Sequence, residues 1–250
     1  MKTALRIILA SATVLTAPFE TFAGTPTEIT LPAGDSAFRG TRLTPYENVW
    51  LYTAKLPSGE IKVQGLWTDH LDRLTREGRT LMRRVQGMTY LTGVTSSQIN
   101  VFDPATMLPV SSELHKFDGS WLKRTFNDAL VTETRGASPA DRDGTTTTAS
   151  FPTAVLDYWG GMYGVLLASL PLHVGDKGTL PSLDEFDPLF KPASFEVLRE
   201  EDIQAGSSGK VHARVVKADS ITYWIAERAP FIIRVTIEMD RGVVAQYDKL

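Results

Sequence analysis

The chain has 250 residues, of which 26 are Lys or Arg and 29 are Asp or Glu, so its formal net charge is −3. Nucleic-acid-binding domains carry a basic face and a high isoelectric point, and this weakly acidic balance argues against that class. The chain contains no cysteine, which excludes disulfides, thiol catalysis and lipid attachment to a cysteine side chain.

The first 23 residues have the order of a secretory signal peptide. Lys2 and Arg6 bracket a basic start, an apolar run covers residues 7–17, and small residues follow at Ala23 and Gly24. An uncleaved membrane anchor is the alternative, but an apolar run of about eleven residues is roughly half of the ~20 that a membrane-spanning helix needs. We therefore expect residues 1–23 to be removed after Ala23, which leaves a soluble, unlipidated protein in the periplasm.

Residues 24–45 are rich in Pro, Gly and Thr and predict an extended lead-in to a single β-rich domain at 46–250. Alternating side chains dominate this domain. Val63, Gly65 and Trp67 share one face of a strand that follows a turn at 57–59, and the same period of two returns at 211–215 and 231–239. Further strands are expected at 79–90, 98–103, 110–117, 120–126, 129–134, 194–200, 221–227 and 243–248.

One helix is expected within this pattern, ending at Pro171. Its apolar stripe consists of Trp159, Tyr163, Leu166, Leu167 and Leu170. About ten strands with short links favour an antiparallel sheet. The predicted fold class is α+β, mostly β: a curved antiparallel sheet, or half-barrel, with the helix packed in its concavity. Residues 135–150, which include four consecutive threonines, predict a polar loop.

No catalytic residue, metal ligand or cofactor is predicted. The residues Gly206-Ser207-Ser208-Gly209 lack the spacing of a nucleophile elbow and are typical of a turn. The four histidines include no pair with the spacing of a helical zinc motif, and the tightest cluster, at 69–72, predicts a solvated turn. Acidic residues at 184–187 predict a surface loop. Three glycines within 160–164 favour close packing of a helix on the sheet over a phosphate loop, because no Lys-Ser or Lys-Thr follows them.

Aromatic side chains are the remaining candidates for a binding site. Indole and phenol rings line sites in which one end of the ring is apolar and the other meets a polar partner. Packing within the core is the alternative for each of them. The ligand-binding residues that the sequence predicts are Trp50, Trp67, Trp121, Trp159, Tyr163 and Trp224.

Four phrases carry a resemblance to a known family: NVFDPATMLPVSSE at 100–113, LPLHVGD at 170–176, TYWI at 222–225 and APFIIR at 229–234. Over roughly residues 46 to 240, the chain resembles the exported bacterial proteins grouped as domain of unknown function 3108. The resemblance implies a curved antiparallel sheet with a helix in its concavity, similar to the periplasmic lipoprotein carriers and the outer-membrane lipoprotein receptor. It implies no catalytic residues, and likeness of fold alone does not establish function.

The leading hypothesis is a non-catalytic periplasmic protein that binds or carries a hydrophobic ligand, either a lipid or an acyl chain. The first alternative is an envelope-assembly module that docks a protein partner through a strand edge or through residues 135–150. The second alternative is a hydrolase whose carboxylates the sequence does not locate. Asp69, Asp72, Asp184 and Asp187 are the acidic residues that can be named for it.

Overall fold

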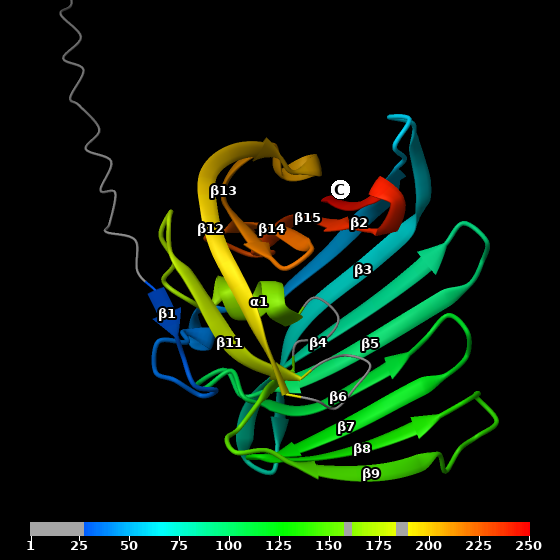
Figure 1. Ribbon diagram of the computed structural model, residues 1–250, viewed down its shortest axis with the longest axis vertical. Coiled ribbons are helices and arrows are strands. Elements are labelled where there is room, and N and C mark those ends of the chain that lie inside the picture. Colours follow the sequence, from blue (N-terminus) through cyan, green and yellow to red (C-terminus); the bar gives the residue numbers. More distant parts are fainter. Residues whose placement is uncertain (1–27, 158–161, 184–189) are drawn as a thin grey trace, which may run out of the picture.

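The computed structural model describes residues 28–157, 162–183 and 190–250 (Figure 1). The predicted signal peptide, Trp159 and the acidic residues at 184–187 lie outside these ranges. The helices are η1 (Gly40–Arg42), α1 (Met162–Ala168), η2 (Gly206–Ser208) and η3 (Asp240–Gly242). The strands are β1 (Glu28–Thr30), β2 (Tyr46–Lys55), β3 (Ile61–Arg76), β4 (Arg79–Tyr90), β5 (Thr95–Phe102), β6 (Pro109–His115), β7 (Trp121–Asn127), β8 (Leu130–Gly136), β9 (Thr145–Ser150), β10 (Leu156–Asp157), β11 (Lys177–Leu183), β12 (Phe190–Gln204), β13 (Lys210–Ala218), β14 (Ile221–Ala226), β15 (Ile232–Glu238) and β16 (Val244–Lys249).

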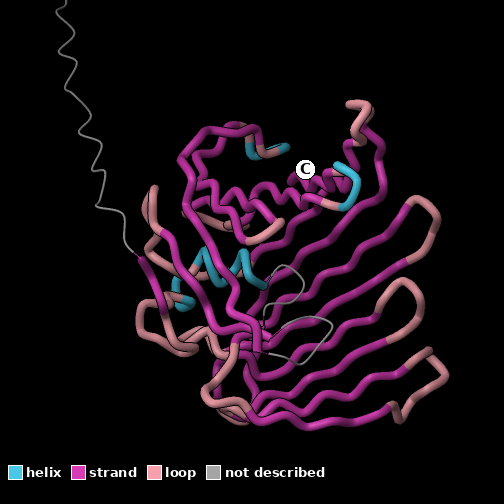
Figure 2. Tube along the Cα trace, viewed as in Figure 1, coloured by secondary structure: helices cyan, strands magenta, loops and turns pink. Residues whose placement is uncertain are grey.

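These strands form one open, curved sheet in the order β1-β11-β12-β13-β14-β15-β16-β2-β3-β4-β5-β6-β7-β8-β9, with β10 also paired to β11 (Figure 2). All neighbours are antiparallel except β1 and β10, which each run parallel to β11. Two meanders, β2–β9 and β11–β16, make up the sheet, and they join where β16 pairs with β2. The curved, mostly antiparallel sheet is confirmed. The expected count of about ten strands is wrong, because the described sheet has sixteen.

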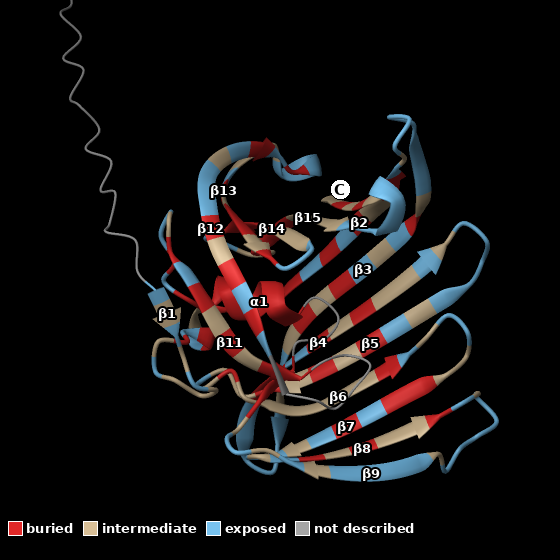
Figure 3. Cartoon of the chain, in the orientation of Figure 1, coloured by how far each residue is buried: buried red, intermediate tan, exposed pale blue. Residues whose placement is uncertain are grey.

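Strand β9 accounts for part of this difference. Residues 135–150 were expected to form a polar loop, but the threonines at 145–148 pair with β8 as the last strand of the sheet. Every residue of β9 except Ala149 is exposed (Figure 3). A strand that is exposed on both faces shows no alternation of apolar and polar residues, so the sequence pattern did not predict it. The β-branched threonines nevertheless favour an extended backbone. The hydroxyls of Thr134 and Thr146 also lie 2.9 Å apart across the two strands.

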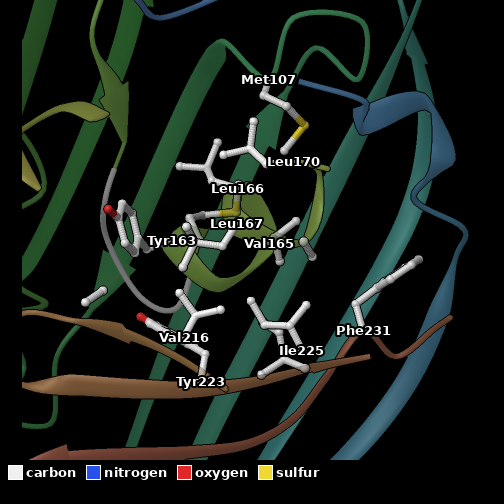
Figure 4. Packing of buried hydrophobic residues seen from close by; sticks show 14 of the residues in the cluster. Met107, Tyr163, Val165, Leu166, Leu167, Leu170, Val216, Tyr223, Ile225 and Phe231 are labelled. Carbon is white, nitrogen blue, oxygen red and sulfur yellow. The ribbon is translucent and has the colours of Figure 1, made fainter. Parts of the chain in front are cut away.

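Helix α1 lies against the inner face of the sheet, in contact with β14 and β15 (Figure 4). All seven of its residues are buried, so it is enclosed on every side instead of presenting one apolar stripe. Gly164 permits this close packing, since a Cβ at that position would lie 2.6 Å from Cδ1 of Ile232 and 2.9 Å from Cδ1 of Tyr223. A glycine in this helix therefore has the packing role that the sequence favoured.

The segment that precedes β2 also reaches the core. Phe38 is 3% exposed and Leu43 is fully buried, and the backbone N–H of Arg39 donates to the carbonyl of Ser169 at 2.8 Å. Within the expected lead-in at 24–45, residues 38–43 thus pack into the core near the end of α1. Among the described residues, none of the helices has the length and apolar character that crossing a bilayer requires.

Candidate functional site

A continuous row of aromatic rings runs along the inner face of the sheet. Ring centroids lie 6.5 Å apart for Trp50 and Trp67, 4.8 Å for Trp67 and Tyr247, and 4.6 Å for Tyr247 and Tyr52. The contacts continue from Tyr52 to Tyr90 at 6.2 Å and from Tyr90 to Phe117, in the turn after β6, at 6.4 Å. We call these six residues the aromatic row. The row leads from Trp50, which is 3% exposed, to Phe117, which is 64% exposed.

Strand register explains why these rings meet. Tyr247 of β16 pairs with Tyr52 of β2, Tyr52 pairs with Gly65 of β3, and Gly65 pairs with Tyr90 of β4. A Cβ at Gly65 would lie 2.2 Å from the carbonyl oxygen of Thr89, so the glycine permits close approach of β3 and β4 between Tyr52 and Tyr90, whose rings meet edge to face. Residues two apart in a strand share a face, which places Trp67 beside Gly65 and directly opposite Trp50.

A cavity of about 60 Å³ lies at the buried end of the aromatic row. Aliphatic side chains of β14 and β15 form part of its wall. The remaining wall comes from Trp50, Trp67, Arg84, Gln86, Tyr223 and Tyr247. Binding pockets for small molecules usually measure roughly 300–1,000 Å³. This cavity is therefore large enough for the end of a small molecule only.

The three tyrosines of the aromatic row have raised pKa values. Burial raises the pKa of Tyr52, Tyr90 and Tyr247 above the ordinary value of 10.0. The folded protein consequently holds protons that the unfolded chain releases above pH 10, so the free energy of unfolding falls as the pH rises beyond that value.

In an alkaline titration followed by tyrosinate absorbance, the tyrosines of the native protein are expected to ionise at a higher pH than those of the protein unfolded in urea. Tyr247→Phe should remove one late-titrating group, and coincident native and unfolded curves would contradict this placement.

A buried ion pair borders the cavity. Nε of Arg84 donates to Oδ1 of Asp69 at 2.8 Å, Nη2 of Arg84 donates to Oδ2 at 2.5 Å, and the hydroxyl of Tyr46 donates to Oδ2 at 3.1 Å. The Asp69 side chain is fully buried and that of Arg84 is 2% exposed. The prediction of a solvated turn at 69–72 is therefore wrong. These residues lie within β3, where alternation turns Asp69 inward and Asp72 toward Arg83 at the surface.

A second group of buried polar residues lies farther along the inner face. In register across β4–β8, Arg84 pairs with Asn100, Asn100 with Ser112, Ser112 with Arg124, and Arg124 with Glu133. Arg124 donates to Glu133 at 2.7 Å, and Asn100 donates to Asp157 of β10 at 3.1 Å. The inner face is thus aromatic and aliphatic toward β14–β16 and polar toward β5–β8. Arg84 and Gln86 of β4 lie between these two regions of the inner face.

The charges of these groups are paired, which favours a structural role for them. Burial alone would raise the pKa of Glu133, but hydrogen bonds from Arg135 and Arg124 outweigh it and leave the pKa of that carboxyl below its ordinary value. Within the described ranges, no cluster of three or more His, Asp or Glu has the arrangement of a metal site.

The structure brings two of the predicted ligand-binding residues together, since Trp50 and Trp67 line the same cavity. Trp121 lies elsewhere, with its Nε1 donating to the carbonyl of Asp141 at 3.0 Å. Trp224 belongs to a separate apolar cluster, where its Nε1 donates to Glu201. Tyr163 is fully buried in α1, and its hydroxyl donates to the carbonyl of Ala193 at 2.9 Å.

Sequence reasoning missed most of this site. The residues of the row and the cavity wall that were not among the predicted ligand-binding residues include Tyr52, Arg84, Gln86, Tyr90, Phe117 and Tyr247. Two signals were present, namely the i, i+2 spacing of Trp50 with Tyr52 and the glycine between inward-facing positions of β3. The pairing of β16 with β2 brings Tyr247 onto Tyr52, and no pattern within either segment alone predicts this pairing.

Comparison with known proteins gives a family and a similar solved structure. The family model described as "Protein of unknown function (DUF3108)" matches residues 59–246. No curated protein matches the chain. Among solved structures, the chain is similar to the crystal structure of a β-barrel-like protein of domain of unknown function DUF1849 from Brucella abortus. That similarity has 10% sequence identity and a TM-score of 0.43, and it covers 84% of this chain and 97% of the other.

Proposed function

The chain belongs to the DUF3108 family, whose function is unknown, and we propose that it binds or carries a hydrophobic molecule along the aromatic row in the periplasm. A lipid or acyl chain is the class of ligand that fits best. The observation that carries this proposal is the unbroken line of ring contacts from exposed Phe117 to the cavity beside Trp50. The signal-like first 23 residues support the periplasmic location.

Apolar burial would supply the binding energy. Each Å² of apolar surface removed from water contributes roughly 25 cal/mol, and aromatic rings offer large rigid surfaces for this. The cavity, which Tyr247 lines, accepts one end of the ligand, and the chain of the ligand extends past the half-buried Tyr52 and Tyr90 toward Phe117. Leu91, which is 72% exposed in the turn after β4, adds apolar surface close to Tyr90.

An interaction module is the second candidate, and the position of β9 favours it. This strand ends the sheet and is exposed along its length, so its outer edge could accept a strand from a protein partner. The backbone N–H of Thr148 points away from β8, because Thr148 alternates with the residues of β9 that bond to β8, so Thr148→Pro would remove a donor from the outer edge without touching the aromatic row. Partner capture that is lost while ligand uptake is retained would support this candidate.

The direct test of the proposal is to export the full chain with its own first 23 residues and purify it from the periplasm without detergent. Mass spectrometry of the intact protein reports whether the chain begins at Gly24. An organic extract of the denatured protein is then analysed for bound molecules. A lipid or acyl species in about equimolar amount is expected, and an empty extract from folded protein would favour the interaction module.

Replacing Trp67 with Ala is expected to weaken binding of the neutral fluorophore N-phenyl-1-naphthylamine by about tenfold, which corresponds to about 1.4 kcal/mol. Trp67 lines the cavity and meets the ring of Tyr247 edge to face, so its loss removes apolar surface and interrupts the aromatic row. Trp121→Ala is the matched control, because Trp121 lies outside both features. Equal affinities of the Trp67→Ala and Trp121→Ala variants would contradict a site at the row.

A further inference from the structure

We propose that the end of the ligand that enters the cavity is an uncharged hydrogen-bond donor, a hydroxyl or an amide N–H, and that it pairs with the side-chain carbonyl of Gln86. This inference rests on the proposed function and names the chemical class of its ligand. The ligand is then a neutral lipid with a hydroxyl or amide head, inserted head first, with its chain directed toward Phe117.

Gln86 supplies the first reason. Its side chain is 3% exposed and lines the cavity, and its Oε1 atom is buried without a hydrogen-bond partner. An unpaired buried carbonyl is unfavourable, so a donor that reaches it gains a full hydrogen bond in a low-dielectric site. The cavity of about 60 Å³ has room for a polar group of the size of one or two water molecules. A hydroxyl or amide at the end of a chain satisfies both the space and the bonding requirement.

The charges around the cavity supply the second reason. Arg84 also lines it, but its guanidinium already makes two bonds to Asp69, and Asp69 also accepts a bond from Tyr46. The buried pair is therefore neutral as a unit. A ligand carboxylate would bring an additional negative charge into a buried site beside Asp69, and such a charge loses its hydration without a counterion of its own. The site thus favours an uncharged head over a fatty acid.

The aromatic row supplies the third reason, because it fixes the direction of the ligand. Polar side chains meet the cavity at Arg84 and Gln86, whereas the opposite direction follows the contacting aromatic rings of Tyr247, Tyr52 and Tyr90 to exposed Phe117. A molecule with one polar end and one apolar chain matches this order only with its polar end inward.

The inference is tested by displacement of N-phenyl-1-naphthylamine from the full mature chain at pH 8 with three competitors. These are 1-decanol, its isomer 1-methoxynonane, which has no O–H, and decanoate. We expect 1-decanol to displace the probe at a concentration at least about tenfold lower than either of the others, a difference of about 1.4 kcal/mol. Decanoate that competes as well as 1-decanol would overturn the neutral head, and 1-methoxynonane that does so would overturn the donor.

The matched variants are Gln86→Met and Gln98→Met. Gln98 faces Gln86 in register on β5 and is 6% exposed, but it does not line the cavity. Gln86→Met should abolish the preference for 1-decanol over 1-methoxynonane, and Gln98→Met should retain it; a preference that survives Gln86→Met overturns the inference. If Gln86→Met fails to fold, Gln86→Leu replaces it, and the ranking of competitors on the unmodified protein remains decisive. Failure of the unmodified protein to bind the probe or any competitor would instead refute the proposed function itself.

Discussion

Replacing Asp69 with Asn is expected to lower the free energy of unfolding by about 3–5 kcal/mol, because it removes the negative partner of a buried cation. Arg84 would keep its charge in a site where its side chain is 2% exposed. The hydroxyl of Tyr46 would also face a weaker acceptor. Urea denaturation followed by far-ultraviolet circular dichroism measures this loss as a lower midpoint at constant slope.

The same two strands offer a matched control. Asp72 of β3 pairs with Arg83 of β4, with Nη2 and Oδ2 2.5 Å apart, but the Arg83 side chain is 44% exposed. Exposed ion pairs contribute roughly 0–1 kcal/mol, so Asp72→Asn should shift the midpoint little. Similar losses for Asp69→Asn and Asp72→Asn would mean that the Arg84–Asp69 pair is accessible to water, contrary to its position beside the cavity.

Tyr163→Ala is expected to cost about 3–5 kcal/mol of stability, the range for deleting a large aromatic side chain from a core. Tyr163 is fully buried, its ring lies 6.4 Å from that of Tyr223, and its hydroxyl donates to Ala193. Tyr163→Phe keeps the ring and loses only the hydroxyl, so a smaller loss of about 1 kcal/mol is expected. Thermal unfolding of the three proteins gives the comparison.

This variant also separates two roles for Tyr163. The sequence predicts that Tyr163 binds ligand, whereas its position in the structure is that of a core residue (Figure 4). If the core role is the whole of its contribution, the folded fraction of Tyr163→Ala should bind N-phenyl-1-naphthylamine with unchanged affinity. A stable Tyr163→Ala protein that has lost binding would reverse this assignment and restore the prediction.

Local patterns were sufficient for much of the fold. Alternation of apolar and polar residues predicted the strands at 79–90 and 221–227 to within a few residues. The helix was predicted from its apolar spacing, although its burial on all sides was not, because a short helix enclosed by a curved sheet needs no polar face. Strand β9 was missed because alternation of apolar and polar residues predicts only strands with one buried face, and β9 has no buried face.

The site was less predictable, for two physical reasons. Arg84 and Gln86 are polar residues that face inward, and alternation within a single strand does not show that a polar position lies inside. The contacts that link Trp67 to Tyr52 through Tyr247 depend on the pairing of β16 with β2, two strands that lie far apart in the sequence. Trp50 and Trp67 were predicted to bind ligand because of their residue type. The contacts of the neighbouring tyrosines with them follow only from the tertiary structure.

The pairing of β16 with β2 also sets the order in which this protein can fold. Each meander contains hairpins whose partners are close in sequence, so these hairpins can form as soon as their residues are available. One edge of β2 stays open until residues 244–249 arrive, nearly the whole domain later, and closing so long a loop is entropically slow. A chain that emerges N-terminus first therefore stays incompletely folded until its final strand is delivered. That final strand brings Tyr247, so the aromatic row is among the last features to be completed.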